Sequence, residues 1–353
     1  MIYLASYLFL SLLSIFDYKI KQKIFFEIFI LILILLFVAT RFNTGGDWTT
    51  YKIYYEQINQ VQYAISELSF YSLNIFIYIF LGTDGVFLKD FIISFFFLSL
   101  FFFFVLKNFS DTFFLLTLSL PILIILLGMG YIRQGLSVSC FLAFISIKEY
   151  RYKLFFLFPM LTFHAFGFIL FFIIICDLLK KAFFKKNFTT HLKVFLFLFL
   201  LIFFSTVLYL FFDILLLKYT HYIKESYLYT SIGSAPRSFL NYVCAILYLF
   251  VYYFKNKIIS QKFDFIFFII SILILILFPL SFYFQTAVDR IGVGFSFIQL
   301  VGPYYFIKYF SNLKIEKFLK CCFLITFFLI FFTWVNFSTN YFNWIYQNLF
   351  FFI

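Results

Sequence analysis

Charged residues are scarce in this chain. Only 12% of its 353 residues are Asp, Glu, Lys or Arg, whereas 65% are hydrophobic. A soluble domain of this size does not bury so much apolar side-chain surface. The composition therefore excludes a soluble globular enzyme and indicates a membrane protein.

Familiar cofactor motifs are absent as well. The chain has no P-loop, no dinucleotide fingerprint, no zinc-binding HExxH and no GxSxG elbow. The cysteines lie in or beside apolar runs, without metal-ligand spacing or a disulfide pattern; they are Cys140, Cys176, Cys244, Cys321 and Cys322. We expect no metal and no cofactor, and we interpret the cysteines as packing residues.

Apolar runs of about 17–25 residues recur along the chain, each long enough to cross the bilayer as a helix. Expected spans are approximately 2–16, 24–40, 86–106, 112–128, 131–147, 194–212, 239–254, 265–284, 291–309 and 320–337. Residues 64–81 form either a further span or an interfacial helix, and 154–178 form one long helix or two short ones. We predict an all-α polytopic membrane protein with about 10–12 transmembrane helices, some of them short interfacial or re-entrant ones, in a single domain over 1–353.

Lysines cluster in short loops between these runs, and the positive-inside rule places such loops in the cytoplasm. If 64–81 does not cross and 154–178 forms a hairpin, the loops at 17–23, 107–111, 148–153, 177–193, 255–262 and 308–320 all face inward, with both termini outside. The loops at 41–63 and 213–238 then face outward. Because this topology accounts for the net charge of +12, no nucleic-acid partner is expected.

Arginine is distributed differently from lysine. Arg41, Arg133, Arg237 and Arg290 each adjoin the end of an apolar run on the predicted outer side. Arginine binds phosphate with two parallel hydrogen bonds, whereas lysine acts as a point charge. The topology therefore predicts an outward group of arginines suited to an anion.

The loop RFNTGGDWTTYKIYY (41–55) follows the second apolar run. Gly45 and Gly46 permit unusual backbone angles or close approach to a ligand. Asp47 is a candidate general base, or it holds an arginine. Tyr51 and its aromatic neighbours either stack on sugars or belong to an interfacial aromatic belt. We favour a functional loop, because connecting loops rarely need this mixture of residues.

Three further segments carry polar groups. GMGYIRQGLS (128–137) places Arg133 and Gln134 at the outer end of a span, where an arginine is costly unless it is paired or faces water. LTFHAFGF (161–168) holds His164, which is either a proton relay or a histidine hydrogen-bonded at a helix break. In TAVDRIG (286–292), Asp289 and Arg290 form a structural pair, or Asp289 steers an arginine that faces the site.

The ordered set of R-x5-D-x3-Y, Y-I-R-Q-G-L-S, F-H-A-F and a late D-R resembles the EpsG-like branch of the Wzy-type polymerases of O-antigen, capsule and exopolysaccharide. The resemblance covers most of the chain. The matching positions are Arg41, Gly46, Asp47, Tyr51, Arg133, Gln134, His164 and Arg290. Ala165 and Phe166 stand where the family tends to have a small residue and a serine, so the resemblance implies no role for a hydroxyl there.

The resemblance implies a metal-independent glycosyltransferase of the bacterial inner (cytoplasmic) membrane. Such an enzyme transfers a growing glycan from undecaprenyl diphosphate to the next lipid-linked oligosaccharide at the outer face, with a flippase and a chain-length regulator as candidate partners. Arg41 and Arg133 would stabilise the diphosphate, and Asp47 or His164 would accept the hydroxyl proton. The substrate-binding positions would be Gly46, Tyr51, Gln134, Arg237 and Arg290.

Two other functions fit part of the pattern. A lipid-linked oligosaccharide flippase or transporter also needs cationic residues, but they would line a cavity through the midplane, whereas these arginines gather at one face. A membrane O-acyltransferase that modifies surface sugars could use His and Arg too. A cytoplasmic donor would then require functional residues inside or across the membrane, and the inward loops have only lysines typical of anchors.

Overall fold

A computed structural model describes residues 2–15, 20–58, 67–184, 234–254, 264–310, 312–337 and 344–348. The expected span 194–212, the loop 255–262 and most of the loop 213–238 lie outside these described residues.

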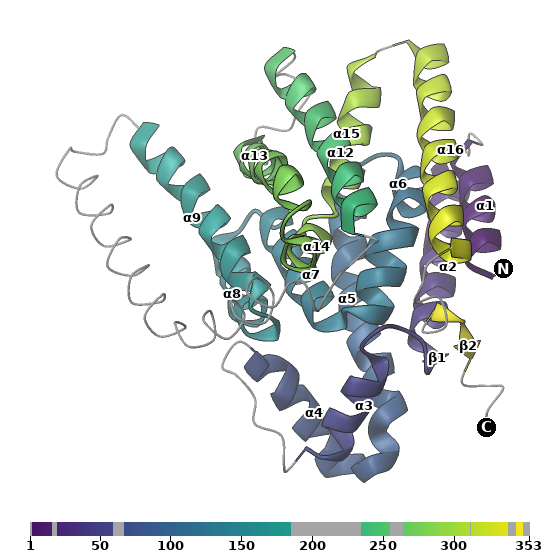
Figure 1. Cartoon of the computed structure of the whole chain (residues 1–353), viewed down its shortest axis with the longest axis vertical. Helices are drawn as coiled ribbons and strands as arrows, with labels where there is room; N and C mark the ends of the chain where they lie inside the picture. Colours follow the sequence, from purple (N-terminus) through teal and green to yellow (C-terminus); the bar gives the residue numbers. More distant parts are fainter. Residues whose placement is uncertain are drawn as a thin grey trace.

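The described part is a bundle of helices with one two-stranded sheet (Figure 1). The helices of the bundle are α1 (Ile2–Ile15), α2 (Ile20–Ala39), α5 (Val86–Asn108), α6 (Thr112–Ser119), α7 (Ile132–Ser146), α9 (Phe166–Phe184), α12 (Ser234–Phe254), α13 (Asp264–Leu280), α15 (Ile298–Tyr309) and α16 (Leu313–Phe337). The remaining elements are β1 (Arg41–Phe42), α3 (Trp48–Glu56), α4 (Leu68–Leu81), the 3-10 helix η2 (Gly82–Gly85), the π-helical η3 (Leu120–Gly130), α8 (Tyr150–Phe163), α14 (Gln285–Gly294) and β2 (Gln347–Asn348).

Four helical stretches in the described ranges are long and apolar enough to cross a membrane: Leu68–Asn108, Thr112–Gly130, Ala235–Phe254 and Leu313–Phe337. Shorter apolar helices accompany them at Ile2–Ile15, Ile24–Ala39, Ile132–Ser146 and Phe265–Leu280. In the stretch Thr112–Gly130, 94% of the residues in its 18-residue apolar window are buried. This stretch is apolar on every side and packs at the centre of the bundle. The prediction of an all-α polytopic membrane protein is confirmed.

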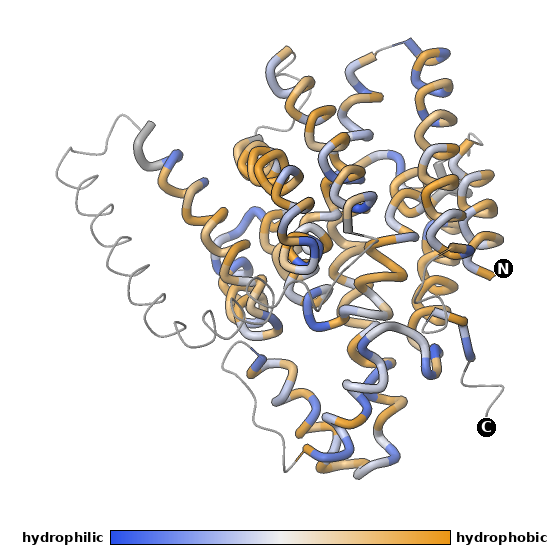
Figure 2. The backbone as a smooth tube through the Cα atoms, viewed as in Figure 1, coloured by the Kyte–Doolittle hydropathy of each residue, from blue (hydrophilic) through white to orange (hydrophobic). Residues whose placement is uncertain are grey.

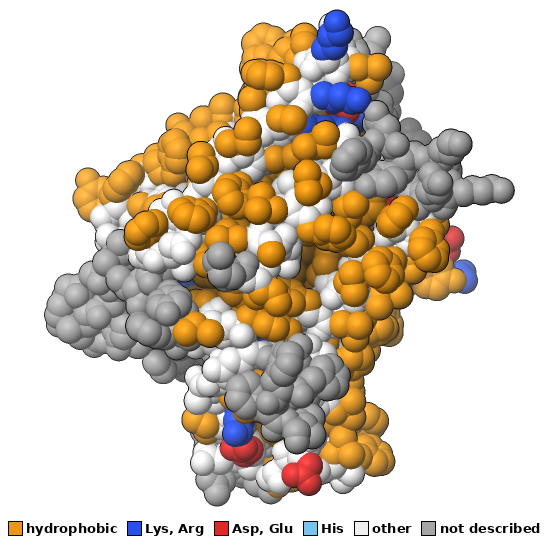
Figure 3. Space-filling view, turned by 90° about the vertical axis from the view of Figure 1, so that its right-hand side faces the viewer, with side chains coloured by type: hydrophobic (Ala, Val, Ile, Leu, Met, Phe, Trp, Pro, Cys, Tyr) orange, Lys and Arg blue, Asp and Glu red, His pale blue; other side chains and the backbone are white. Residues whose placement is uncertain are grey.

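The two ends of the bundle differ in charge. Apolar residues colour the middle of the helices, and hydrophilic residues lie toward their ends (Figure 2). In the space-filling view, Lys and Arg side chains gather at the upper end, while the lower lobe also exposes acidic groups (Figure 3). At the upper end, Lys320 pairs with both Asp111 and Glu316, and so joins the start of α6 to α16. The opposite end holds α3, α4 and the loop that follows α2 (Figure 1).

Residues 154–178 do not form one continuous helix. α8 ends at Phe163, His164 is extended, and α9 begins at Phe166, which confirms the alternative of two helices. The two backbones approach closely at Gly167, where an added Cβ would lie 2.0 Å from the Met160 carbonyl oxygen. Within 64–81, the residues from Leu68 onward form α4, and whether this helix crosses the membrane stays a prediction.

A buried ion pair at the start of α5 holds α3 in place. Lys89 and Asp90 of α5 lie 3.3 Å apart, both almost fully enclosed. The Lys89 ammonium donates to the Tyr51 carbonyl at 3.3 Å, and the Trp48 indole donates to Asp90 at 3.0 Å. Charges in such an apolar setting persist only with partners of this kind. The pair therefore fixes α3 on the first turns of α5.

Trp48→Phe is expected to lower the stability of the purified protein by about 2 kcal/mol, because it removes a hydrogen bond to a buried carboxylate and keeps most of the ring. Thermal unfolding in detergent measures the effect. Trp334→Phe is the matched control, since the Trp334 ring only stacks on Phe331 and packs edge-on against Trp344. Equal shifts in the two variants would show that the bond to Asp90 contributes nothing.

Candidate functional site

The loop after α2 is held by a segment that lies far along the chain. β1 pairs antiparallel with β2, with Arg41 opposite Asn348. The Thr44 hydroxyl donates to the Ile345 carbonyl at 3.2 Å. Gly45 has φ +116°, and an added Cβ would lie 2.2 Å from the Met129 carbonyl oxygen. Glycine is thus required here for contact with the protein's own backbone at the end of η3.

Arg41 lies inside the protein, with 2% of its surface exposed. Its guanidinium Nη1 donates to the Val38 carbonyl at 2.9 Å and to the Ser94 hydroxyl at 2.8 Å. These contacts tie the end of α2 to α5. The described geometry therefore gives Arg41 a structural setting, and its predicted grip on a diphosphate stays a prediction.

Asp47 has two polar neighbours from different parts of the chain. Its carboxylate accepts a hydrogen bond from the Tyr51 hydroxyl at 3.4 Å, and the same oxygen lies 3.8 Å from Arg290 Nη1 on α14. Asp47 and Arg290 are 28% and 40% exposed, so solvent and solutes reach the pair. Burial raises the pKa of the Tyr51 phenol, although Arg133 opposes this shift, and Tyr51 is therefore a neutral hydrogen-bond donor.

Arg133, near the start of α7, lies on the other side of Tyr51. Its Nη1 forms an ion pair of 2.6 Å with Glu67, just before α4. The guanidinium also lies over three aromatic rings, with its Cζ 5.1 Å from the ring centre of Tyr51, 6.0 Å from that of Tyr54 and 5.9 Å from that of Phe70. Stacking of this kind holds a guanidinium flat and in place.

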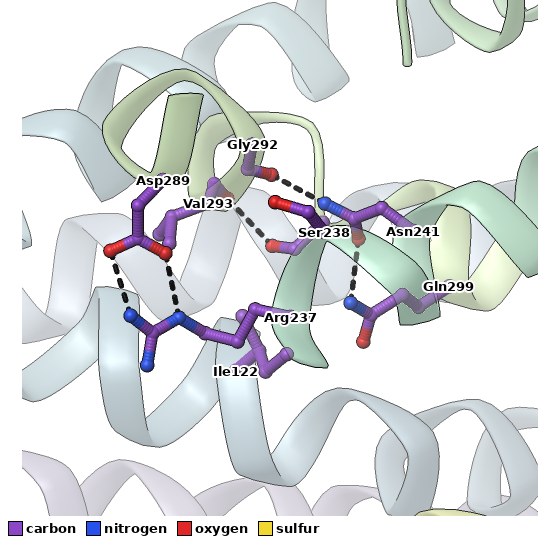
Figure 4. Close-up of a pocket in the computed structure, with 9 residues that line it drawn as sticks. Ile122, Arg237, Ser238, Asn241, Asp289, Gly292, Val293 and Gln299 are labelled. Carbon is purple, nitrogen blue, oxygen red and sulfur yellow. Dashed lines mark hydrogen bonds and ion pairs between the residues drawn. The ribbon is translucent and has the colours of Figure 1, made fainter. Parts of the chain in front are cut away.

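Arg290 is oriented by residues at the start of α7. Its guanidinium lies 4.2 Å from the ring centre of Tyr131, and the Gln134 amide donates to the Arg290 carbonyl at 2.7 Å. The neighbouring residue, Asp289, faces elsewhere and forms a bidentate pair with Arg237, at 2.8 and 2.7 Å (Figure 4). Asp289 thus has Arg237 as a partner, and both arrangements expected for Asp289 with Arg290, a structural pair or steering, stay predictions.

A narrow polar pocket adjoins the Arg237–Asp289 pair between α12, α14 and α15 (Figure 4). The Asn241 amide donates to the Gly292 carbonyl at 2.8 Å, and the Gln299 amide donates to the Asn241 oxygen at 2.6 Å. The first bond joins α14 to α12, and the second joins α12 to α15. They fix the position of the helix that carries Arg290.

His164 and Gly46 each lie beside other parts of the protein itself. The His164 Nδ1 accepts a hydrogen bond from the Phe166 N–H at 3.1 Å, as expected for a histidine at a helix break. An added Cβ on Gly46 would only touch Trp344, at 3.9 Å. Neither contact tests a role in catalysis or substrate binding, so both roles stay predictions.

The structure thus brings Asp47, Tyr51, Arg133 and Arg290 together at one end of the bundle. It adds two residues that the sequence analysis did not select, Glu67 and Tyr131. Tyr131 stands two residues before Arg133 in the sequence. Glu67 is an isolated charge at the start of an apolar helix, and this position is the sequence signal that could have identified it. Two arginines, each facing a carboxylate, can bind a polyanion where that carboxylate moves away.

No group of three or more His, Cys, Asp or Glu side chains placed to hold a metal ion occurs in the part of the chain that the structure describes. No curated protein and no solved structure matches the chain. The model of the EpsG family matches residues 23–348. Since this match covers nearly the whole chain, the protein belongs to the EpsG family, which indicates a polymerase of exopolysaccharide type.

Proposed function

We propose that this protein polymerises an extracellular polysaccharide by transferring a growing glycan from undecaprenyl diphosphate to the next lipid-linked repeat unit. Membership of the EpsG family supports a polymerase. One observation carries the finer proposal: Arg290 and Arg133, from distant helices, flank the Asp47–Tyr51 pair. Such a site has cations for a leaving diphosphate and a carboxylate for a hydroxyl proton.

The proposed reaction is a single displacement. The acceptor hydroxyl oxygen attacks the anomeric carbon of the donor glycan and forms the new glycosidic bond. The bond from that carbon to the diphosphate oxygen breaks, and its electron pair stays on the diphosphate. Asp47 takes the hydroxyl proton, while Tyr51 donates to Asp47 and orients it.

Arginine is the group that we propose to stabilise the leaving diphosphate. Negative charge grows on the diphosphate oxygens as the bond breaks, and preorganised N–H donors stabilise growing charge most effectively in a partly dehydrated site. Arg290 is 40% exposed and lies 3.8 Å from the Asp47 carboxylate, so an incoming phosphate can reach it from solvent. Arg237 is held by two bonds to Asp289, and we assign it to positioning α14 rather than to direct contact.

Reconstitution tests this proposal. Purified protein in proteoliposomes, supplied with lipid-linked repeat unit, is expected to produce a ladder of polymer without nucleotide, and with a chelator present. Release of undecaprenyl diphosphate should match the number of new linkages. Movement of labelled lipid-linked unit between leaflets without any ladder would instead identify a flippase, and an acylated repeat unit would identify an O-acyltransferase.

We propose that the Asp47 end of the bundle faces outward in the cytoplasmic membrane. Lys52 is partly exposed at this end, and Lys314 is exposed at the lysine-rich end. In a cysteine-free variant within intact cells, Lys52→Cys is expected to react with an impermeant maleimide, whereas Lys314→Cys is expected to react only after permeabilisation. The reverse pattern would invert the proposed orientation.

A further inference from the structure

Glu67 directs its carboxylate toward the candidate site. It precedes α4 but makes no capping hydrogen bond to the first turn of that helix. Glu67 Oε2 lies 2.6 Å from Arg133 Nη1 instead. The carboxylate therefore serves the arginine rather than the end of its own helix.

Arg133 does not depend on Glu67 for its place. The rings of Tyr51, Tyr54 and Phe70 surround its guanidinium. The guanidinium would therefore remain in position if Glu67 moved away. The helix that carries Glu67 is attached separately, through a 2.5 Å hydrogen bond between Ser69 and Thr162 of α8.

The ion pairs of the site differ in how readily they exchange. Arg237 and Asp289 share two hydrogen bonds, and Asp289 is only 8% exposed. Arg133 and Glu67 share one short contact and are 16% and 23% exposed. A pair that is reached by solvent and joined at one nitrogen opens more easily than a buried bidentate pair.

We propose that Glu67 is an internal competitor for Arg133, occupying the edge of the guanidinium that a phosphate of the lipid diphosphate binds. The inference rests on the proposed function and names the positioning residue that tunes its anion site. Carboxylate and phosphate oxygens require the same donor, so binding of one displaces the other. The apparent affinity for a diphosphate then equals the intrinsic affinity multiplied by the fraction of Arg133 that is free of Glu67.

The competition has a direct use in turnover. Loss of the glycan converts a diphosphate diester into a monoester, which can carry one more negative charge than the substrate. A purely cationic site would therefore hold the product more tightly than the donor. A carboxylate that returns to Arg133 favours departure of the product.

Glu67→Gln is the test, because glutamine keeps the shape and removes the charge. Binding of farnesyl diphosphate to the purified full-length protein is measured by calorimetry, and polymer formation is measured with lipid-linked repeat unit. We expect the dissociation constant for farnesyl diphosphate to fall about five- to tenfold, the size of a partly exposed charge-assisted pair. Inhibition by added undecaprenyl diphosphate should strengthen by a similar factor, and KM should fall while kcat does not rise.

Glu56→Gln is the matched control, since Glu56 makes an exposed pair with Lys52 on α3 and carries the same charge. It should leave the affinity unchanged. If Glu67 merely holds α4 in place, Glu67→Gln will bind farnesyl diphosphate more weakly and unfold at lower temperature, which overturns the proposal. If the wild-type protein makes polymer but Glu67→Gln binds farnesyl diphosphate with unchanged affinity, the role of Glu67 is overturned while the proposed function stands. Failure of the wild-type protein both to bind the diphosphate and to make polymer would overturn the proposed function and this inference together.

Discussion

Replacement of Arg133 by lysine is expected to slow polymer formation about a hundredfold or more, while the protein remains in the membrane. Lysine keeps the positive charge but lacks the planar fork that binds two phosphate oxygens and stacks on the rings of Tyr51 and Phe70. Loss of one donor to developing charge typically costs roughly 3–4 kcal/mol of transition-state stabilisation. The rate of ladder formation from lipid-linked repeat unit measures the effect.

Arg151→Lys is the matched control for this experiment. Arg151 lies on the first turn of α8, is exposed, and stands between Lys148 and Lys153 in the sequence. The same substitution there should leave the rate unchanged. Wild-type polymer lengths and rates in Arg133→Lys would instead make Arg133 a membrane anchor.

Arg41→Lys is expected to reduce polymer too, for a different reason. Lysine cannot reproduce both donations to Val38 and Ser94, so the loop that carries Asp47 should lose its support. A fall in thermal stability should therefore accompany the fall in activity for Arg41→Lys, but not for Arg133→Lys.

Asp47→Asn is expected to bind lipid-linked substrate but to extend it about a thousandfold more slowly, the size typical of a lost general base. Asparagine still accepts a hydrogen bond from Tyr51, yet it cannot take the acceptor proton. The variant should therefore show a pH profile of activity that differs from that of the wild type. The measurement is ladder formation across a pH series.

His164→Gln separates the second candidate base from the first. The His164 Nδ1 already accepts the Phe166 N–H, and we expect the glutamine variant to keep most of its activity if the role of His164 is to shape the helix break. Asp84→Asn, in the exposed turn η2, is the control for a lost surface charge. Normal activity and an unchanged pH profile in Asp47→Asn would remove Asp47 as the base. If His164→Gln were also fully active, the acceptor would need only orientation.

The sequence predicted the helices well where apolar length alone determines them. The span expected at 86–106 is α5 at Val86–Asn108, and that expected at 112–128 is α6 with η3. The break near His164 was one of two alternatives for residues 154–178, since a polar residue and a glycine interrupt an apolar run there. In these cases one physical requirement, burial of a continuous apolar surface, fixes the answer.

Pairing between charges could not be predicted in the same way. Asp289 and Arg290 are adjacent in sequence, but consecutive side chains on a helix point about 100° apart, so they face different neighbours. Which neighbours these are depends on how α14 packs against α12, α13 and α7, and no local pattern contains that information. Asp289 therefore faces Arg237, and Arg290 faces Asp47.

Lys89 and Asp90 show a signal that was present but not used. Both stand at the beginning of an apolar run, where unpaired charges are costly, so their presence alone indicates partners. The sequence analysis selected neither residue. Its contact with the Tyr51 carbonyl links it to the candidate site instead.

The strand pairing between β1 and β2 constrains when this protein becomes competent during its synthesis. Thr44 bonds to Ile345, which the ribosome adds 301 residues later, and Trp344 lies against Gly46. The early helices can enter the membrane one after another, but the loop that holds Asp47 stays incomplete until translation has passed β2. Chains that stall or are cleaved before this point are expected to insert into the membrane but to lack activity.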